Sequence, residues 1–134
     1  MRLWHKDLIE YLPKSQLLAQ WRELNSIYKK QDNHILINYI YNYPKDDLWS
    51  YSKIVIDELV KRNIKIKSFN NYNSYFTASY SFLELPFKNH QDNRYLLQCF
   101  YNLQEKFDRG QKDFTLELYN KIVQLLKIKG LLND

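Results

Sequence analysis

The chain is poor in the two residues that interrupt helices. Among its 134 residues it has 2 glycines and 3 prolines. Collagens, low-complexity linkers and turn-rich β-sandwiches need many of both, so this scarcity argues against all three. Apolar residues make up 45% of the chain and charged residues 26%, which provides material for a buried core and is not typical of disorder. The sequence therefore favours a folded chain made of helices.

Two segments in the first half carry apolar residues at helical spacing. In the segment Lys14–Lys30 these residues form the apolar stripe of an amphipathic helix. The second segment begins after Pro44 and runs to about Arg62. The acidic pair Asp46 and Asp47 stands at its start, where negative charge favours a helix N-terminus. We expect one helix in each segment.

Two more helices are predicted in the second half of the chain. Asp92 could cap a helix whose apolar residues lie between positions 95 and 107, and Gly110 follows that helix. Asp113 could cap the last helix, and Gly130 follows its final turn. Glycine readily adopts the left-handed conformation that often ends a helix.

The remaining stretches are typical of loops. The segment Ser68–Ser81 is rich in Asn, Ser and Tyr and is predicted to form a long loop, while the alternating residues Ile64–Lys67 are too few to predict a strand. A chain of this length suits one domain and is too short for two ordinary ones. The expected fold is all-α: a compact single domain, residues 1–134, with a bundle of about four helices and long irregular loops.

Several function classes are disfavoured by what the sequence lacks. Cys99 is the single cysteine, which excludes an intramolecular disulfide and a multi-cysteine zinc site and is typical of a reducing compartment. His5, His34 and His90 are far apart and no nucleotide-binding or metal-binding motif occurs, so we expect no metal and no cofactor. No signal peptide is evident, and no stretch approaches the roughly 18 apolar residues of a membrane span. We therefore expect a cytoplasmic protein with no membrane contact.

The charge balance favours an acidic partner. The net charge is +5, and most of the excess lies in the first half of the chain. A basic chain of this kind suits nucleic acid, although many basic proteins bind none. The residues favour no particular oligomeric state.

The most informative segment is Gln16–Leu24. On a helix, Glu23 lies one turn from Gln20 and two turns from Gln16, so the three form a polar strip beside the apolar stripe. Arg22 adjoins this strip. A carboxylate flanked by cations could be a catalytic group, but a solvent-exposed face with weak ion pairs explains the same pattern.

The run QLLAQWREL at positions 16–24 resembles HLMAEYREL of the phage pyrimidine dimer DNA glycosylases, the endonuclease V type. The identical residues are Leu17, Ala19, Arg22, Glu23 and Leu24. The opening residues, the histidine at position 34 and the segment 55–67 also resemble that family, and RLWH and LP..QLL.QWRE resemble its bacterial branch. The likeness covers about residues 1–67 and is lost in the last predicted helix.

This resemblance implies a DNA glycosylase and abasic-site lyase that acts on pyrimidine-dimer (UV-damaged) or abasic double-stranded DNA. In that family the nucleophile is the α-amino group of the first residue, here Met1, which forms an imine with the deoxyribose before β-elimination breaks the strand. An α-amino group suits this step because its ordinary pKa, about 7.7–8.0, lies near neutrality. Glu23 matches the family's carboxylate, which implies stabilisation of the cationic sugar and proton transfer. Met1 and Glu23 are the expected catalytic residues.

The resemblance also implies the DNA contacts. Arg2 and Arg22 would hold phosphates beside the lesion and would lower the pKa of the terminal amine. The full expected set is Arg2, Gln16, Arg22, Ser26, Lys29, Lys30 and His34. Two of these positions depart from the phage pattern, since Gln16 replaces a histidine and Ser26 an arginine. Further attraction that weakens with salt would come from Lys61, Arg62, Lys65 and Lys67, although solubility alone accounts for them equally well.

Two aromatic residues on the apolar stripe of the first helix, Trp21 and Tyr28, are expected to pack in the core rather than to stack on bases. Two other functions stay open from the residues alone. The chain could be a non-catalytic DNA-binding module that uses its basic first half. It could also be a protein-interaction domain whose aromatic loop Tyr72–Tyr80 binds a partner.

Overall fold

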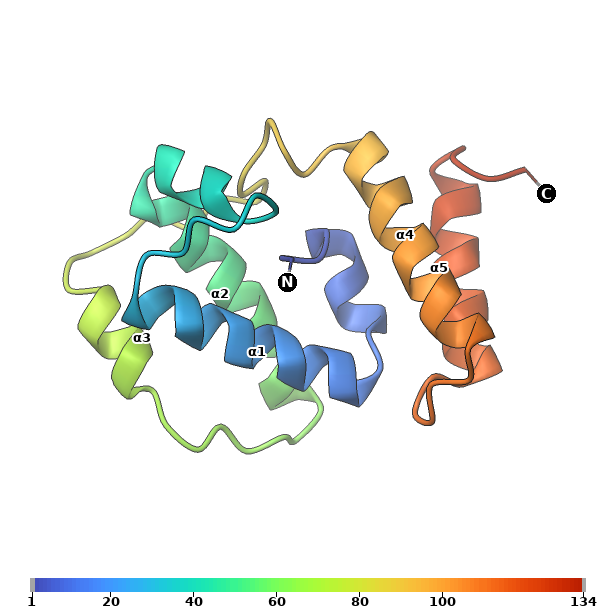
Figure 1. Ribbon diagram of the computed structural model, residues 1–134, viewed down its shortest axis with the longest axis horizontal. Helices are drawn as coiled ribbons and strands as arrows, with labels where there is room; N and C mark the ends of the chain where they lie inside the picture. The colour runs from blue at the N-terminus through green and yellow to red at the C-terminus, as the bar shows by residue number, and fades with distance from the viewer. Residues whose placement is uncertain (1, 134) are drawn as a thin grey trace.

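The computed structural model describes residues 2–133, and helices are the regular structure of this part of the chain (Figure 1). In chain order the elements are η1 (Lys6–Tyr11), α1 (Lys14–Lys29), η2 (Asn38–Asn42), α2 (Lys45–Lys61), α3 (Asn70–Tyr75), α4 (Asn93–Asp108) and α5 (Leu116–Ile128), where η marks a 3-10 helix. Residues 2–133 contain no strand, which confirms the all-α prediction. None of these helices is long and apolar enough to cross a membrane.

The four helices predicted from periodicity are α1, α2, α4 and α5, and their ends fall within a few residues of the predicted ones. The Asp92 carboxylate caps α4 by accepting a hydrogen bond from the backbone N–H of Tyr95 at 2.9 Å. Gly110 and Gly130 follow α4 and α5 with φ angles of +81° and +75°. Both glycines therefore end their helices in the left-handed conformation that the sequence indicated.

The predicted cap of the last helix is wrong. Thr115 caps α5, since its hydroxyl accepts from the N–H of Leu118. The carboxylate of Asp113 instead accepts from the backbone N–H and the hydroxyl of Ser15, at 2.7 and 2.9 Å. The side chain of Asp113, which the local pattern predicted as a helix cap, thus bonds to Ser15 at the start of α1 instead.

Three short elements were not predicted. η1 and η2 are 3-10 turns of 6 and 5 residues, and α3 is a 6-residue helix inside the stretch 68–81 that was expected to be a loop. Elements this short present no sustained periodicity. Residues Ile64–Lys67 are irregular, as expected.

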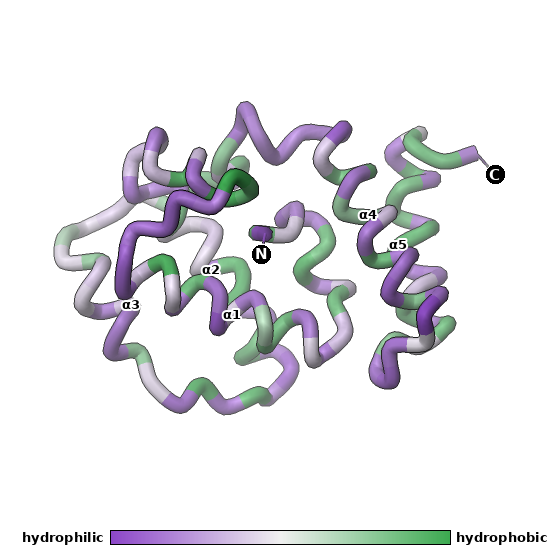
Figure 2. Tube along the Cα trace, viewed as in Figure 1, coloured by the Kyte–Doolittle hydropathy of each residue, from purple (hydrophilic) through white to green (hydrophobic). Residues whose placement is uncertain are grey.

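The helices form two groups on either side of the N-terminal segment. α1 packs against α2 and α3, and α4 packs against α5, while η1 contacts both α2 and α5 (Figure 1). Apolar and polar stretches alternate along the trace (Figure 2). The hydrophobic core draws on both groups and on the N-terminal segment; its fully buried side chains include Leu3, Leu8, Leu17, Leu24, Tyr51, Val55, Leu96, Leu103, Ile122 and Leu126.

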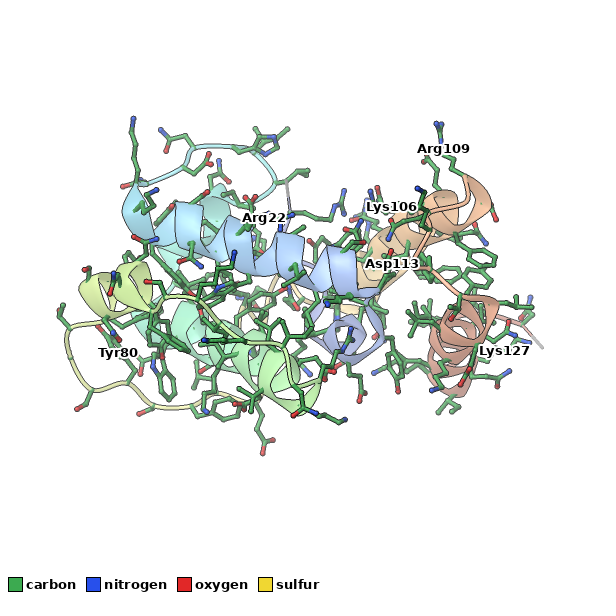
Figure 3. All side chains as sticks on the ribbon, turned by 90° about the horizontal axis from the view of Figure 1, so that it is seen from below. Arg22, Tyr80, Lys106, Arg109, Asp113 and Lys127 are labelled. Atoms are coloured by element: carbon green, nitrogen blue, oxygen red, sulfur yellow. The ribbon has the colours of Figure 1, made fainter. Side chains whose placement is uncertain are left out.

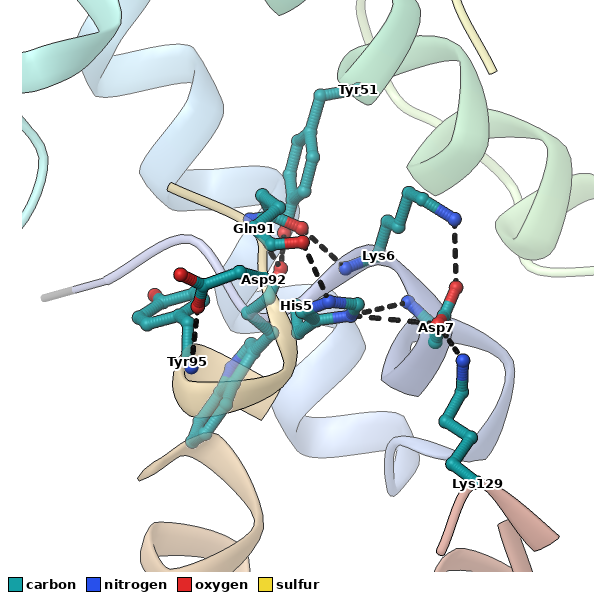
Figure 4. Close-up of polar contacts among 9 residues, drawn as sticks. His5, Lys6, Asp7, Tyr51, Gln91, Asp92, Tyr95 and Lys129 are labelled. Carbon is teal, nitrogen blue, oxygen red and sulfur yellow. Dashed lines mark hydrogen bonds and ion pairs between the residues drawn. The ribbon is translucent and has the colours of Figure 1, made fainter. Parts of the chain in front are cut away.

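His5 joins the N-terminal segment to the residues before α4 (Figure 4). The imidazole is buried, and its Nδ1 accepts from the N–H of Asp7 at 3.1 Å, capping η1. Its Nε2 lies 3.0 Å from the carbonyl of Gln91 and donates to it. Burial lowers the pKa of His5; Asp7 opposes this shift, and Lys6 and Lys129 add to it. Protonation would place a hydrogen on Nδ1 and remove the cap.

We expect the free energy of unfolding to fall as the pH is lowered through about 6.5, the ordinary pKa of histidine. The lowered pKa of His5 means that the unfolded chain binds a proton more readily than the folded one, so acid favours unfolding. Urea unfolding at a series of pH values measures this. His5→Asn, which keeps a cap acceptor without a titrating group, should flatten the dependence between about pH 5 and 7. If the free energy of unfolding of His5→Asn depends on pH as that of wild type does, other titrating groups cause the dependence.

Candidate active site

A pocket of about 340 Å³ lies between α1 and α4, beside the N-terminal segment. We call it the Glu23 pocket. α1 contributes more lining residues than any other element, because side chains one turn apart on a helix share a face. Its lining residues are Arg2, Trp4, Gln16, Ala19, Gln20, Glu23, Leu36, Asn102 and Lys106.

Glu23 is half-buried in this pocket, and its carboxylate is incompletely paired. Within residues 2–133 no group donates a hydrogen bond to its buried Oε1. Burial raises the pKa of Glu23; the amino-terminal charge and His34 act in the opposite direction, and Asp32 adds to the rise. Folded proteins rarely leave a buried oxygen without a donor, since this costs about 1–3 kcal/mol. The carboxylate is therefore able to accept a hydrogen bond from a group outside residues 2–133.

Gln20 links the N-terminal segment to α1 at the base of the pocket. Its Oε1 accepts from the backbone N–H of Trp4 at 2.7 Å, and its Nε2 donates to the carbonyl of Arg2 at 3.2 Å. Met1 lies outside the described residues. Arg2, the residue to which it is joined, lines the same pocket as Glu23.

The predicted site residues divide between two faces of α1. Arg2, Gln16 and Glu23 come together in the Glu23 pocket. Arg22 points about 100° around the helix from its neighbour Glu23. It lines a separate groove of about 500 Å³ with Ser26 and Lys29.

This second groove runs between α1 and the segment 64–68, and we call it the α1–loop groove. Lys65 and Lys67 add two more cations to its lining, and Trp21 adds an indole. Trp21 is half-buried, so the core role predicted for it is only partly met. Tyr28 is buried and its hydroxyl bonds to Ser52, as a core residue would.

Other predicted DNA contacts do not line either hollow, although His34 is near enough for its charge to act on Glu23. Lys30 and His34 are exposed after the end of α1 and line neither one. Nδ1 of His34 accepts from the N–H of Leu36 at 3.2 Å. Lys61 is also exposed.

Arg62, grouped in the sequence with the DNA-attracting cations, is engaged inside the protein. Its guanidinium donates to Glu58 at 2.7 Å and to the backbone carbonyls of Leu12 and Glu10 at 2.7 and 3.1 Å. These contacts give Arg62 a structural role, because they hold the end of η1 against the end of α2, and its attraction for DNA stays a prediction.

A family model described as pyrimidine dimer DNA glycosylase matches residues 1–71. The chain belongs to the pyrimidine dimer DNA glycosylase family. Neither a curated protein nor a solved structure matches the chain. The match includes Arg2, Gln16, Gln20 and Glu23, which make up one side of the pocket.

The other side of this glycosylase's pocket comes from the region beyond the family match. Asn102 and Lys106 of α4 line the pocket together with residues of α1, and sequence reasoning missed both. Figure 3 labels Lys106 on α4. Their spacing of four residues places them on one helix face, but nothing in the pattern connects that face with Glu23. Gln16 also reaches across, since its Nε2 donates to Oε1 of Gln111 at 3.0 Å.

Among residues 2–133, no three His, Cys, Asp or Glu side chains gather closely enough to hold an ion. The charged side chains that line the Glu23 pocket are the carboxylate of Glu23 and the cations of Arg2 and Lys106.

Proposed function

We propose that this member of the family is a DNA glycosylase with abasic-site lyase activity, acting on double-stranded DNA that carries pyrimidine dimers or abasic sites. The observation that supports the proposal most is the buried oxygen of Glu23, which has no donor among residues 2–133 and lies in a pocket that Arg2 also lines. The nucleophile is the α-amino group of Met1, as the family resemblance implies.

The reaction begins with the neutral amine of Met1. Its lone pair attacks C1′ of the damaged nucleotide, the glycosidic bond breaks, and the base leaves with the bonding electrons and takes up a proton. Loss of the amine proton and opening of the sugar ring give an imine. Removal of a proton from C2′ then expels the 3′ phosphate, which breaks the strand, and water hydrolyses the imine to free the amine.

Glu23 is assigned two parts in this sequence. As a carboxylate, it stabilises positive charge on the sugar during base loss and can accept a proton in the elimination step. Its raised pKa favours proton transfer close to neutrality more than an ordinary glutamate would. In this proposal Arg2 and Lys106 hold phosphates at the pocket, because guanidinium and ammonium groups pair with phosphate oxygens.

The cations of the α1–loop groove extend the contact with DNA. Arg22, Lys29, Lys65 and Lys67 are exposed and line this groove, which lies on a different face of α1 from the Glu23 pocket. They are proposed to contact the backbone without reading the sequence, which makes binding weaken as salt rises. Reaching C1′ inside a duplex also requires the nucleotide to leave the stack, and a damaged pair lowers that cost.

Borohydride trapping tests this function. Protein with a free N-terminus is incubated with an abasic duplex or a UV-irradiated duplex and reduced, so that any imine becomes a stable adduct. We expect an adduct on both DNAs, and we expect it to disappear when the terminal amine is acetylated. An undamaged duplex serves as the control. No adduct from protein with a confirmed free N-terminus would contradict the proposal.

A further inference from the structure

The N-terminal segment Arg2–Lys6 is held almost entirely by side chains. Residues 2–5 form no helix or strand, and Lys6 begins η1, so the backbone groups of residues 2–5 lack the partners that regular structure provides. Four buried or half-buried side chains bond to it instead: Gln20, Tyr51, Gln91 and Tyr95. We call these four residues the cradle.

Gln20 is the member of the cradle nearest the first residue. Its side chain is buried with 2% of the residue exposed, and its contacts use both ends of the amide. Oε1 accepts from the N–H of Trp4 at 2.7 Å and, at 3.0 Å, shares the single hydrogen of the Tyr51 hydroxyl with the Trp4 carbonyl; Nε2 donates to the carbonyl of Arg2 at 3.2 Å. The chain is therefore fixed at two backbone points, one of them on the residue joined to Met1.

The rest of the cradle fixes the following carbonyls. The Tyr95 hydroxyl donates to the carbonyl of Leu3, and the Tyr51 hydroxyl donates to that of Trp4 at 2.5 Å. Oε1 of Gln91 accepts from the N–H of Lys6 at 2.7 Å, and its Nε2 lies 3.4 Å from the Trp4 carbonyl (Figure 4). Each residue from Arg2 to Trp4 thus has at least one backbone group that is hydrogen-bonded to a side chain.

The cradle and Glu23 share a rigid support. Gln20 and Glu23 are three residues apart in the middle of α1, on the same face, and both line the Glu23 pocket. A side chain that fixes Arg2 to α1 consequently fixes the start of the chain relative to the Glu23 carboxylate. Such control matters for a nucleophile, because a misplacement of about 1 Å can lower a rate by about 100-fold.

We propose that Gln20 is the positioning residue that sets the terminal amine against Glu23, with Tyr51, Gln91 and Tyr95 completing its support. This inference rests on the proposed function, since it assumes that the amine is the nucleophile. Gln20 does not touch the substrate in this assignment. It acts through the backbone of Arg2 and Trp4.

The test compares Gln20→Met with wild type in single-turnover imine formation on an abasic duplex. Methionine keeps the length and approximate volume of glutamine and removes all three hydrogen bonds. We expect the rate of adduct formation to fall about 100-fold, with the Kd for a non-cleavable abasic-analogue duplex unchanged. The amine itself should react with formaldehyde and borohydride as fast as in wild type, because its intrinsic chemistry is intact.

Tyr28→Phe is the matched control. This change removes a buried hydrogen bond between α1 and Ser52 and alters no contact of the N-terminal segment. It therefore lowers the stability of the fold without changing the position of the terminal amine. Its rate should equal that of wild type at a temperature where both are folded. If Gln20→Met does not fold, Tyr95→Phe takes its place, because it removes only the hydroxyl on the Leu3 carbonyl; a loss of about tenfold is expected.

The outcomes separate this inference from the proposed function. A wild type that forms no adduct would overturn both. A folded Gln20→Met variant, or Tyr95→Phe in its place, that forms the adduct at the wild-type rate would overturn the positioning role alone. An equal loss of rate in Tyr28→Phe would also overturn it, because the loss would then follow from reduced stability.

Discussion

Replacing Glu23 with glutamine is expected to lower the rate of strand cleavage by about 100- to 10,000-fold, the usual contribution of a positioned acid–base group. Glutamine keeps the shape of the side chain but carries no negative charge and does not take up a proton near neutral pH. Binding should persist, because the cations Arg2 and Lys106 and those of the α1–loop groove are unchanged. Gel-based cleavage of an abasic duplex measures the rate, and fluorescence anisotropy measures the Kd.

Glu117→Gln is the matched control for this change. It removes the same charge from α5, where Glu117 is exposed and pairs with Lys121 at 3.6 Å. Cleavage by this variant should equal that of wild type. Wild-type cleavage by Glu23→Gln would remove Glu23 from the mechanism, whereas weakened binding with unaltered turnover would make it a substrate-binding residue.

The second large effect concerns stability. Arg62→Met is expected to lower the free energy of unfolding by about 3 kcal/mol, as the loss of one partner of a buried ion pair does. Glu58, with a side chain 10% exposed, would lose its partner at 2.7 Å, and the carbonyls of Leu12 and Glu10 would lose their donor. Differential scanning calorimetry should show a fall in Tm on the order of 10 °C.

An exposed ion pair provides the comparison. Arg109 bonds to Glu105 at 3.1 Å with the same spacing of four residues, but both side chains are largely in solvent. Arg109→Met should therefore leave the Tm nearly unchanged. Equal effects in the two variants would show that Arg62 contributes no more than a surface arginine does.

The long helices could be predicted from the sequence because their apolar residues repeat over three or more turns. α1 was predicted at 14–30 and spans Lys14–Lys29. The short elements could not be predicted, because η1 and α3 have six residues each, too few for a repeating apolar pattern, and they pack against helices distant in sequence. The capping error at Asp113 has the same origin, since its partner Ser15 lies 98 residues away.

Only part of the candidate site could be predicted from the sequence, for a similar reason. A helix face can be derived from spacing, which placed Glu23 with Gln20 and Gln16. The position of α4 cannot be derived from spacing, because it depends on how the α4–α5 pair packs against η1. The sequence therefore did not predict that Asn102 and Lys106 line the pocket. Adjacency along the chain also does not place Arg22 beside Glu23, because the two side chains line different hollows.

Trp4 gives the molecule an optical reporter at the place where chemistry is proposed. Its indole is 94% shielded, lines the Glu23 pocket and has the Arg2 guanidinium 5.8 Å from the ring centre. The other two tryptophans lie elsewhere: Trp21 lines the α1–loop groove, and Trp49 stacks near Tyr80 with ring centres 6.4 Å apart. Intrinsic fluorescence from single-tryptophan variants can thus distinguish occupancy of the pocket from occupancy of the groove in real time, without any attached dye.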